Sequence, residues 1–253
     1  MKSYKTELDP NNAQRTACLR AAGASRWAYN FGLRRKQEAW AARKAALAAG
    51  TPKDAAPKIP TAIDLHRELN RLKQIPVAQG GVAWMRESSK CAPQEGLRNL
   101  DRALDGFLRR VKAGQRPGYP RFKSRKRGIG SFTLTGAIRV TDRTIQLPRL
   151  GVLRLKERGY FPTDERVVAA TVSEQAGRWF VSIRTDADPS RPHGTERLGV
   201  DVGVRKLAVC SDGTTFQNPR ALRSAEQRMR VLQKAVTRKK RGGANPRKAV
   251  RRL

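Results

Sequence analysis

Hydrophobic residues recur at a helical spacing through the first half of the chain. Between residues 11 and 49 they return every three or four positions, with Trp27 and Phe31 four apart on one face. Gly23 and Gly32 interrupt this stretch, and we expect them to divide it into two or three pieces. The pattern predicts a helical N-terminal region with a helix-turn-helix-like start.

Capping signals predict where the helices begin. Asp9 followed by Pro10 is typical of an N-cap and a first helical residue. Thr61 with Asp64 three positions later resembles a capping box and opens the next helix. A third helix is expected after Pro93, because an apolar stripe at steps of three and four faces a core there: Leu97, Leu100, Leu104, Phe107, Leu108 and Val111.

In the second half of the chain the spacing of hydrophobic residues changes to a period of two, which predicts strands. A β-rich block with hairpin turns is expected over residues 131–135, 138–147, 152–156, 166–174 and 179–185. Residues 2–8 alternate loosely and could add a strand to this block, which we expect to be a small barrel. Three shorter strands are expected before a C-terminal helix that reaches at least residue 240: residues 198–204, 206–210 and 215–216.

Charge decides which partners this α+β chain can have. Its 253 residues carry 54 Lys and Arg against 21 Asp and Glu, a formal net charge of +33 at pH 7. A compact protein with this imbalance repels itself unless a polyanion neutralises it, and 38% hydrophobic residues still provide a core. We expect nucleic acid rather than a membrane surface, because the C-terminal helix offers few large apolar residues.

Several classes of protein are excluded by what the sequence lacks. No apolar run is long enough to cross a membrane, and residues 1–12 lack the apolar stretch of a signal peptide. Three separate cysteines, Cys18, Cys91 and Cys210, indicate a reducing cytoplasm, where DNA binding would associate the protein with the nucleoid. With two histidines and no C-x-x-C pair, we expect no structural zinc site in this chain.

Positive charge concentrates in two stretches. Residues 107–130 hold nine Lys or Arg and no acid, and residues 219–253 hold thirteen with Glu226 as the one acid. Solvated faces usually mix signs, so we expect both stretches to contact phosphates. Tyr119 could stack on a base or fill a seam between helices and barrel, whereas Phe122 is expected in a core. The predicted nucleic-acid contacts are Arg109, Arg110, Lys112, Arg116, Tyr119, Arg121, Lys123, Arg125, Lys126, Arg127, Arg238, Lys239, Lys240 and Arg241.

One short segment, residues 198–209, indicates catalysis. It places Asp201 in the middle of an apolar strand, between small residues. A carboxylate in such a strand is costly unless it binds a cation or a hydrogen-bond donor. In RNase H-like nucleases the first metal-binding aspartate occupies such a strand, and the alternative is an aspartate at a strand bulge. We expect Asp201 to be a catalytic and metal-binding residue.

Several segments carry a resemblance that extends along nearly the whole chain. They are residues 8–14, 25–33, 97–103 with Phe107, 120–125, 198–207, 211–213 and 218–219. In this order they resemble the TnpB family, transposon-encoded RNA-guided DNA nucleases that are also called OrfB-type transposases and are related to the type V CRISPR effectors. The resemblance implies transposition and DNA recombination as the context, guide RNA and target DNA as partners, and Asp201 as the first carboxylate of a RuvC site.

The resemblance also implies an architecture that accommodates the expected elements. Residues 1–10 would form the first strand of a wedge-type β-barrel, and residues 11–118 a helical recognition lobe inserted into it. Residues 119–192 would complete the barrel. Residues 193–253 would form the first part of an RNase H-like (RuvC) α/β domain.

A complete RuvC site in this family holds Mg²⁺ with three carboxylates, and we expect this chain to supply only one. After Asp201 the sequence contains Asp212, expected in a turn, and Glu226, expected in the basic helix. The family's zinc-binding cysteines are absent as well. We therefore expect a C-terminally truncated, cleavage-incompetent chain that binds RNA and DNA and leaves the strand of Asp201 as an unpaired sheet edge.

Two other functions stay open on the sequence alone. One is a complete Mg²⁺-dependent RNA-guided DNA endonuclease, if the sequence continues beyond Leu253. The other is an unrelated basic RNA-binding protein, which the ordered matches disfavour. The hypothesis of binding without cleavage also includes a nuclease-dead repressor that RNA guides to DNA.

Overall fold

The chain folds into two compact units, Met1–Ala187 and Asp188–Leu253, each with its own antiparallel sheet. The computed structural model describes residues 1–187, 198–239, 246 and 249–250. The mixture of helices and strands agrees with the α+β class expected from the sequence. Within the described residues, no helix is both long enough and apolar enough to span a membrane.

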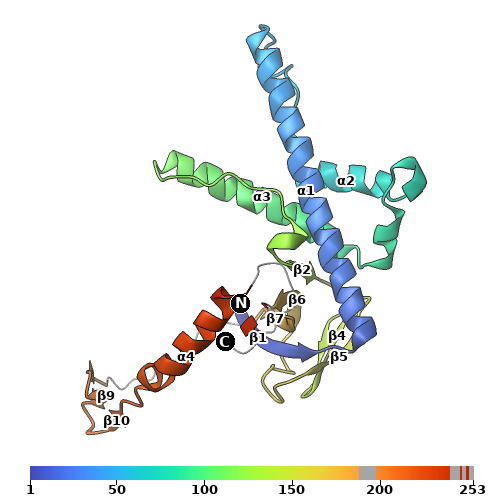
Figure 1. The fold of residues 1–253 in the computed structure, drawn as a ribbon. Helices are drawn as coiled ribbons and strands as arrows, with labels where there is room; N and C mark the ends of the chain where they lie inside the picture. Colours follow the sequence, from blue (N-terminus) through green and yellow to red (C-terminus); the bar gives the residue numbers. More distant parts are fainter. Residues whose placement is uncertain (188–197, 240–245, 247–248, 251–253) are drawn as a thin grey trace. The chain divides into compact units, whose positions relative to one another are not determined.

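The helical part of the first unit consists of three α-helices and three short 3₁₀ helices. In chain order the six elements are α1 (Asn12–Ala48), α2 (Ala62–Leu72), η1 (Val77–Gln79), η2 (Ala83–Glu87), α3 (Cys91–Lys112) and, after a loop, η3 (Arg125–Arg127) (Figure 1).

The start of α1 differs from the sequence prediction. Asn11 is the N-cap, and its side chain accepts from the Gln14 N–H at 2.9 Å while the Gln14 side chain accepts from the Asn11 N–H at 3.1 Å. This capping box satisfies two backbone N–H groups at the start of the helix. The N-cap therefore lies two residues after Asp9, so the predicted start at Asp9 and Pro10 was wrong. The capping box predicted at Thr61 is confirmed, with Asp64 as its partner.

Gly23 and Gly32 do not divide α1, which is one continuous helix of 37 residues. Close packing explains Gly32, since a Cβ there would come 2.9 Å from two leucine methyl groups of α3. At Gly96 of α3 a Cβ would come 2.5 Å from the Ser25 carbonyl oxygen of α1. The prediction of a broken helix was wrong because Gly32 serves the crossing of α1 and α3 rather than a turn.

The apolar stripe predicted along α3 is buried only at its start. Leu97 and Leu100 are fully buried, whereas Leu108 and Val111 are 42% and 47% exposed. Figure 1 shows the reason, because α3 diverges from α1 after the crossing and its C-terminal turns have no helix beside them. The expectation that the whole stripe faces a core was therefore wrong for the last two turns.

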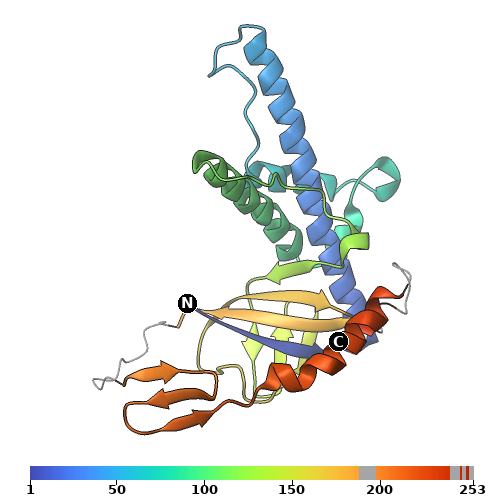
Figure 2. The ribbon, with the colours of Figure 1, turned by 60° about the vertical axis from the view of Figure 1, so that its left-hand side comes forward.

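The sheet of the first unit is built around the N-terminal strand. All pairs are antiparallel, and the order is β2-β6-β7-β1-β5-β4-β3 (Figure 2). The prediction that residues 2–8 join this sheet is confirmed. The strands are β1 (Lys2–Asp9), β2 (Ser131–Leu134), β3 (Arg139–Val140), β4 (Thr144–Leu147), β5 (Gly151–Leu155), β6 (Val167–Gln175) and β7 (Arg178–Thr185).

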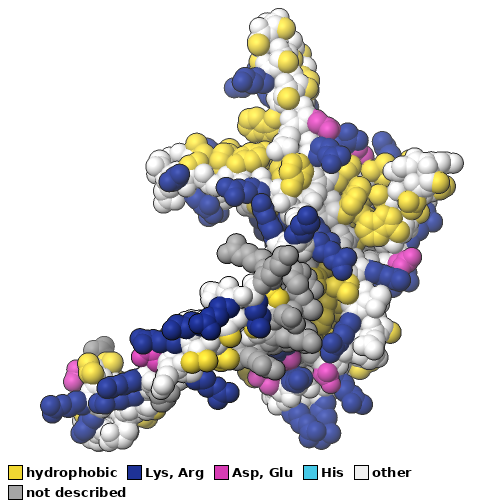
Figure 3. All heavy atoms as spheres, in the orientation of Figure 1, with side chains coloured by type: hydrophobic (Ala, Val, Ile, Leu, Met, Phe, Trp, Pro, Cys, Tyr) yellow, Lys and Arg dark blue, Asp and Glu magenta, His cyan; other side chains and the backbone are white. Residues whose placement is uncertain are grey.

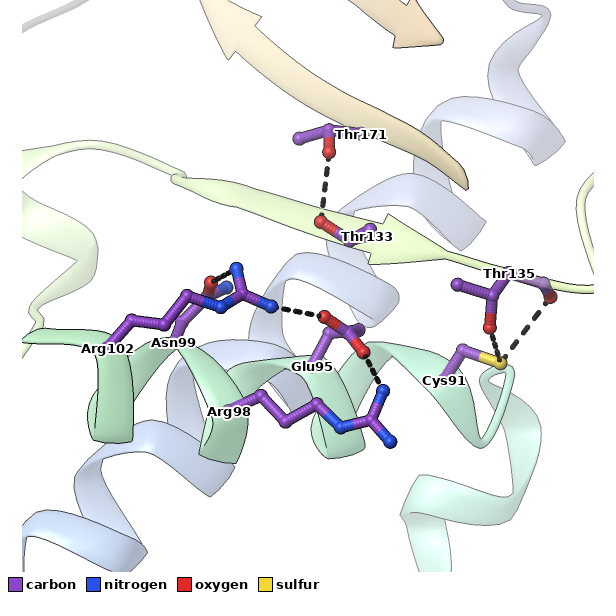
Figure 4. A network of polar contacts seen from close by, with 8 residues as sticks. All are labelled: Cys91, Glu95, Arg98, Asn99, Arg102, Thr133, Thr135 and Thr171. Atoms are coloured by element: carbon purple, nitrogen blue, oxygen red, sulfur yellow. Dashed lines mark hydrogen bonds and ion pairs between the residues drawn. The ribbon is translucent and has the colours of Figure 1, made fainter. Parts of the chain in front are cut away.

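The hydrogen-bonded order of the described strands ends at β2 and β3, so the closed barrel expected from the sequence is not observed. The outer side of β2 meets α3 instead of a strand. The Thr135 hydroxyl just beyond β2 donates to Cys91 Sγ of α3 at 3.3 Å, and Thr133 and Thr171 share a hydrogen bond of 2.9 Å between β2 and β6 (Figure 4). A helix therefore covers the edge that a closed barrel would pair with another strand.

The core of the sheet is shared with the first turns of α1. Alternate residues of the strands are buried, as the period of two predicted. Small side chains of α1, Cys18, Ala21 and Ala22, lie in the same cluster. Burial raises the pKa of the Cys18 thiol to about 12.

The second unit contains β8 (Val200–Val202), β9 (Lys206–Cys210), β10 (Thr215–Gln217) and α4 (Ala221–Thr237). The strand order is β10-β9-β8, so within the described residues β8 pairs on one side only. The edge position expected for the strand of Asp201 is thus observed. Three antiparallel strands and a helix do not by themselves establish an RNase H-like fold, which stays a prediction.

Candidate nucleic-acid interface and metal site

The basic segment that follows α3 is fixed to the side of α1. The Asn30 side chain donates from Nδ2 to the Lys123 carbonyl and accepts the Lys123 N–H at Oδ1, both at 2.8 Å. Arg26 donates to the Ile129 carbonyl at 2.9 Å, and Lys123 Nζ lies 4.0 Å from the centre of the Tyr29 ring. These contacts hold residues 121–130 in place, although only η3 has regular structure there.

The turn η3 presents three adjacent cations to solvent. Arg125, Lys126 and Arg127 are exposed, and Ser124 Oγ caps the turn by accepting the Lys126 N–H at 3.1 Å. Among the described residues, no ion pair includes a base from residues 107–130, whereas many other arginines and lysines are paired with acids. These side chains are therefore available to phosphates.

A hollow of about 480 Å³ lies between this segment and α1, and Arg26, Arg121 and Arg127 line it together with Glu174. Burial and the neighbouring charge of Arg125 lower the pKa of the Arg26 guanidinium, which nevertheless stays protonated at neutral pH. Like charges that converge at a surface favour the binding of an anion between them. The geometry suits a backbone phosphate.

Phe122 also lines this hollow and is 45% exposed, so the prediction that it lies in a core was wrong. The anchor at Lys123 explains the difference. In an extended chain, neighbouring side chains point to opposite sides, and Lys123 points to Tyr29 on α1. Phe122 is left on the wall of the hollow, where it faces solvent rather than a core.

Sequence reasoning predicted the cations but missed the residues that position them. Arg26, Tyr29 and Asn30 belong to a segment that resembled the family, and their signal was a group of polar side chains on one face of a helix. Their partners are about a hundred positions away along the chain, so no local pattern could pair them. Arg109, Arg110, Lys112 and Arg116 are exposed at the end of α3 and after it, as expected. Figure 3 shows Lys and Arg side chains gathered along α3.

In the second unit, Arg238 and Lys239 are exposed at the end of α4. Lys240 and Arg241 lie outside the described residues. Asp201 is exposed on β8, opposite Val209 of β9. One neighbouring strand is too little to cover it.

The described residues do not fit the magnesium site that the family resemblance implies. Hydrogen bonds from the Thr214 backbone and side chain hold the pKa of Asp212 below its usual range, and that residue lies in the expected turn. Glu226 pairs with Arg230 at 2.7 Å on α4. Within the described part of the chain, no three His, Cys, Asp or Glu residues come close enough to hold a metal ion. The described residues therefore do not complete a set of metal ligands around Asp201, and no catalytic step through a metal can be assigned to them.

Comparison with known proteins gives two matches to sequence families. Residues 1–45 match a family described as "Helix-turn-helix domain", and residues 180–253 match one described as "Probable transposase". In this structure the first match covers β1 and most of α1, a strand followed by one continuous helix.

Individual relatives agree over most or all of the chain. "Putative RNA-guided DNA endonuclease InsQ" of Escherichia coli (strain K12) is 28% identical over 257 residues, which cover 100% of this chain and 58% of that protein. "Putative RNA-guided DNA endonuclease" of Streptomyces pristinaespiralis gives the same identity and coverage.

"Putative RNA-guided DNA endonuclease MT2953" of Mycobacterium tuberculosis (strain CDC 1551 / Oshkosh) is 31% identical over 267 residues, 94% of this chain and 55% of that protein. The chain thus spans somewhat more than half the length of these relatives. The two family matches and the three relatives agree, and the chain belongs to the TnpB family.

Proposed function

We propose that this chain binds guide RNA and target DNA in a TnpB-type system and does not cleave DNA by itself. The observation that carries the proposal is the set of unpaired cations on residues 121–127, which the side chains of Asn30 and Arg26 anchor to a rigid helix. The names of the relatives support RNA and DNA as the partners. Such a protein would act in the cytoplasm, on the nucleoid.

The physical basis of binding is the release of counterions. Each cation that replaces a condensed ion on a phosphate contributes to affinity, and this contribution falls as salt rises. Cations that are already paired with acids contribute less, because the pair must open first. The cations of η3 have no such partner in the described residues and are held in position before binding, which reduces the conformational entropy lost on binding.

The carboxylates support the proposal that this chain does not cleave DNA by itself. Asp201 stands alone on an exposed strand among the described residues, whereas a two-metal nuclease site needs several acids around the scissile phosphate. A second candidate function, Mg²⁺-dependent cleavage of DNA, is favoured by the names of the relatives. It requires carboxylates that reach Asp201 from elsewhere.

Binding is tested by replacing Arg125, Lys126 and Arg127 with glutamine and titrating structured RNA at several salt concentrations. Each lost phosphate contact lowers the slope of log affinity against log salt by ~0.7 to 0.9, so the triple variant should lose about 2. The matched control replaces three exposed lysines elsewhere in the first unit, Lys44, Lys53 and Lys58, and changes the net charge equally. An equal loss of slope in both variants would contradict the assignment of the interface to η3.

Cleavage is tested with the purified chain, co-purified RNA, matching DNA and Mg²⁺. We expect no product from this chain or from its Asp201→Ala variant. Cutting by the unaltered chain that Asp201→Ala abolishes would refute the proposal and establish the second candidate.

A further inference from the structure

A second hollow, of about 590 Å³, opens where α1 and α3 diverge. It is separate from the basic hollow beside residues 121–130 and lies within the first unit. Figure 3 shows hydrophobic side chains gathered in the angle between the two helices. Its apolar wall is formed by Trp40, Ile59, Leu104, Phe107, Leu108 and Tyr119.

Large apolar side chains of this wall face solvent. Trp40 is 51% exposed, and Leu108 and Tyr119 are each 42% exposed. Tyr119 is held edge-on against Phe107, with ring centres 5.2 Å apart and planes at 84°. Exposed aromatic residues that converge on one hollow are typical of a binding site, because a ligand removes their surface from water.

The polar side of the hollow contains two carboxylates, one with partners inside the fold and one without such partners among the described residues. Asp101 pairs with the buried Lys36 at 2.9 Å and accepts the Ala62 N–H at 3.0 Å, while Lys36 also donates to the Pro60 carbonyl at 2.6 Å. That group is satisfied within the fold. Asp105, one helical turn further along α3, is exposed and has no ion pair or side-chain hydrogen bond with the described residues.

We propose that this hollow receives one unstacked nucleobase that carries an exocyclic amino group, as cytosine does. The inference rests on the proposed function, because the base would belong to the bound nucleic acid. Aromatic side chains stack on the face of a base, and a carboxylate accepts hydrogen bonds from the cytosine amino group. The carbonyl oxygen that uracil has at this position would instead repel Asp105.

The surrounding charges favour a base over a phosphate inside the hollow. Asp105 repels phosphate, whereas Arg109, Arg110 and Lys112 follow directly on the last turn of α3. The helix thus offers one free carboxylate for the base and cations for the adjoining backbone within two turns. An apolar peptide side chain would use the aromatic wall but would give Asp105 no role.

The test compares binding of single-stranded oligocytidine and oligouridine twelve nucleotides long, measured by fluorescence anisotropy at fixed salt. We expect about tenfold tighter binding of oligocytidine, because oligouridine lacks the amino group that donates to the carboxylate and places a repelling carbonyl oxygen there. Asp105→Asn should abolish this preference, because an amide can also donate to the uracil carbonyl. Trp40→Ala should weaken both oligonucleotides by roughly tenfold through lost stacking. Both side chains are exposed, so neither change should affect folding.

Two matched controls lie outside the hollow. Trp84→Ala removes another exposed tryptophan and Asp54→Asn another exposed aspartate, and both should retain the preference and the affinity. Equal binding of the two oligonucleotides by the unaltered protein would overturn the base pocket while leaving the proposed function in place. Absence of binding to any nucleic acid would overturn both.

Discussion

Replacing Gly96 with alanine tests the crossing of α1 and α3, the two helices that line the apolar hollow. The added Cβ would come 2.5 Å from the carbonyl oxygen of Ser25 and 3.2 and 3.3 Å from its carbonyl carbon and Cα. All three are backbone atoms, so no side chain can move aside and the helices must separate. Overpacking of this kind costs about 1–3 kcal/mol. Alanine is favoured over glycine inside a helix by about 1 kcal/mol, so we expect a net loss of about 0–2 kcal/mol in the free energy of unfolding.

Gly106 provides the control on the same helix. A Cβ at Gly106 would meet nothing within 4 Å, so Gly106→Ala should raise stability by about 0.5–1 kcal/mol through helix propensity alone. The measurement is urea unfolding of the full chain followed by circular dichroism at 222 nm. Opposite signs are expected for the two variants. A gain of similar size at Gly96 would refute the close approach of the two helices.

Three further predictions concern the sheet, the anchor and the exposed edge. The pKa of Glu7 is lowered mainly by the hydrogen bond from Arg178. The stabilisation that ionised Glu7 gives the fold is therefore complete above the usual glutamate pKa and is lost as the pH falls through the lowered value. The gap in Tm between the unaltered protein and Glu7→Gln should therefore shrink between about pH 5 and pH 3, and a constant gap would contradict this. Asn30→Ala frees the backbone of Lys123 without changing any charge, so RNA affinity should fall while the slope of log affinity against log salt stays the same. A change in that slope would mean that Asn30 affects the number of phosphate contacts. Val202 is 74% exposed on β8, and Val202→Lys should reduce concentration-dependent association in sedimentation velocity runs, with no reduction counting against the edge as the contact.

Local patterns predicted those elements whose stabilising contacts are local. The capping box of α2 joins Thr61 and Asp64, three residues apart, and the sequence alone identified it. The alternation of residues 2–8 likewise predicted a strand of the main sheet, because one face of that strand is buried. The local pattern could not predict the register of β1 or the strands beside it, because the ladder that pairs β1 with β7 joins residues from opposite ends of the first unit.

Most of the predictions that failed depended on contacts between distant segments. The start of α1 is the exception, because the capping box that sets it joins Asn11 and Gln14, three residues apart. Gly32 suggests a break when only its neighbours are considered, and its role becomes clear only beside α3. Asp201 lies on an apolar strand, yet burial of such a strand requires neighbouring strands on both sides and a covering layer. Within the described residues β8 has one neighbour, so Val200 and Val202 are exposed with it.

The distribution of ion pairs explains why so basic a chain folds and still attracts a polyanion. Several acids of the first unit serve the scaffold: Glu95 is buried and accepts from Arg98 and Arg102 on α3 (Figure 4), and Asp101 holds Lys36. A surface evolved only for solubility would mix acids among all its bases. Here the described ion pairs leave residues 107–130 without any acidic partner. The repulsion within that segment is relieved when phosphates bind, so the same imbalance that burdens the free protein favours the complex.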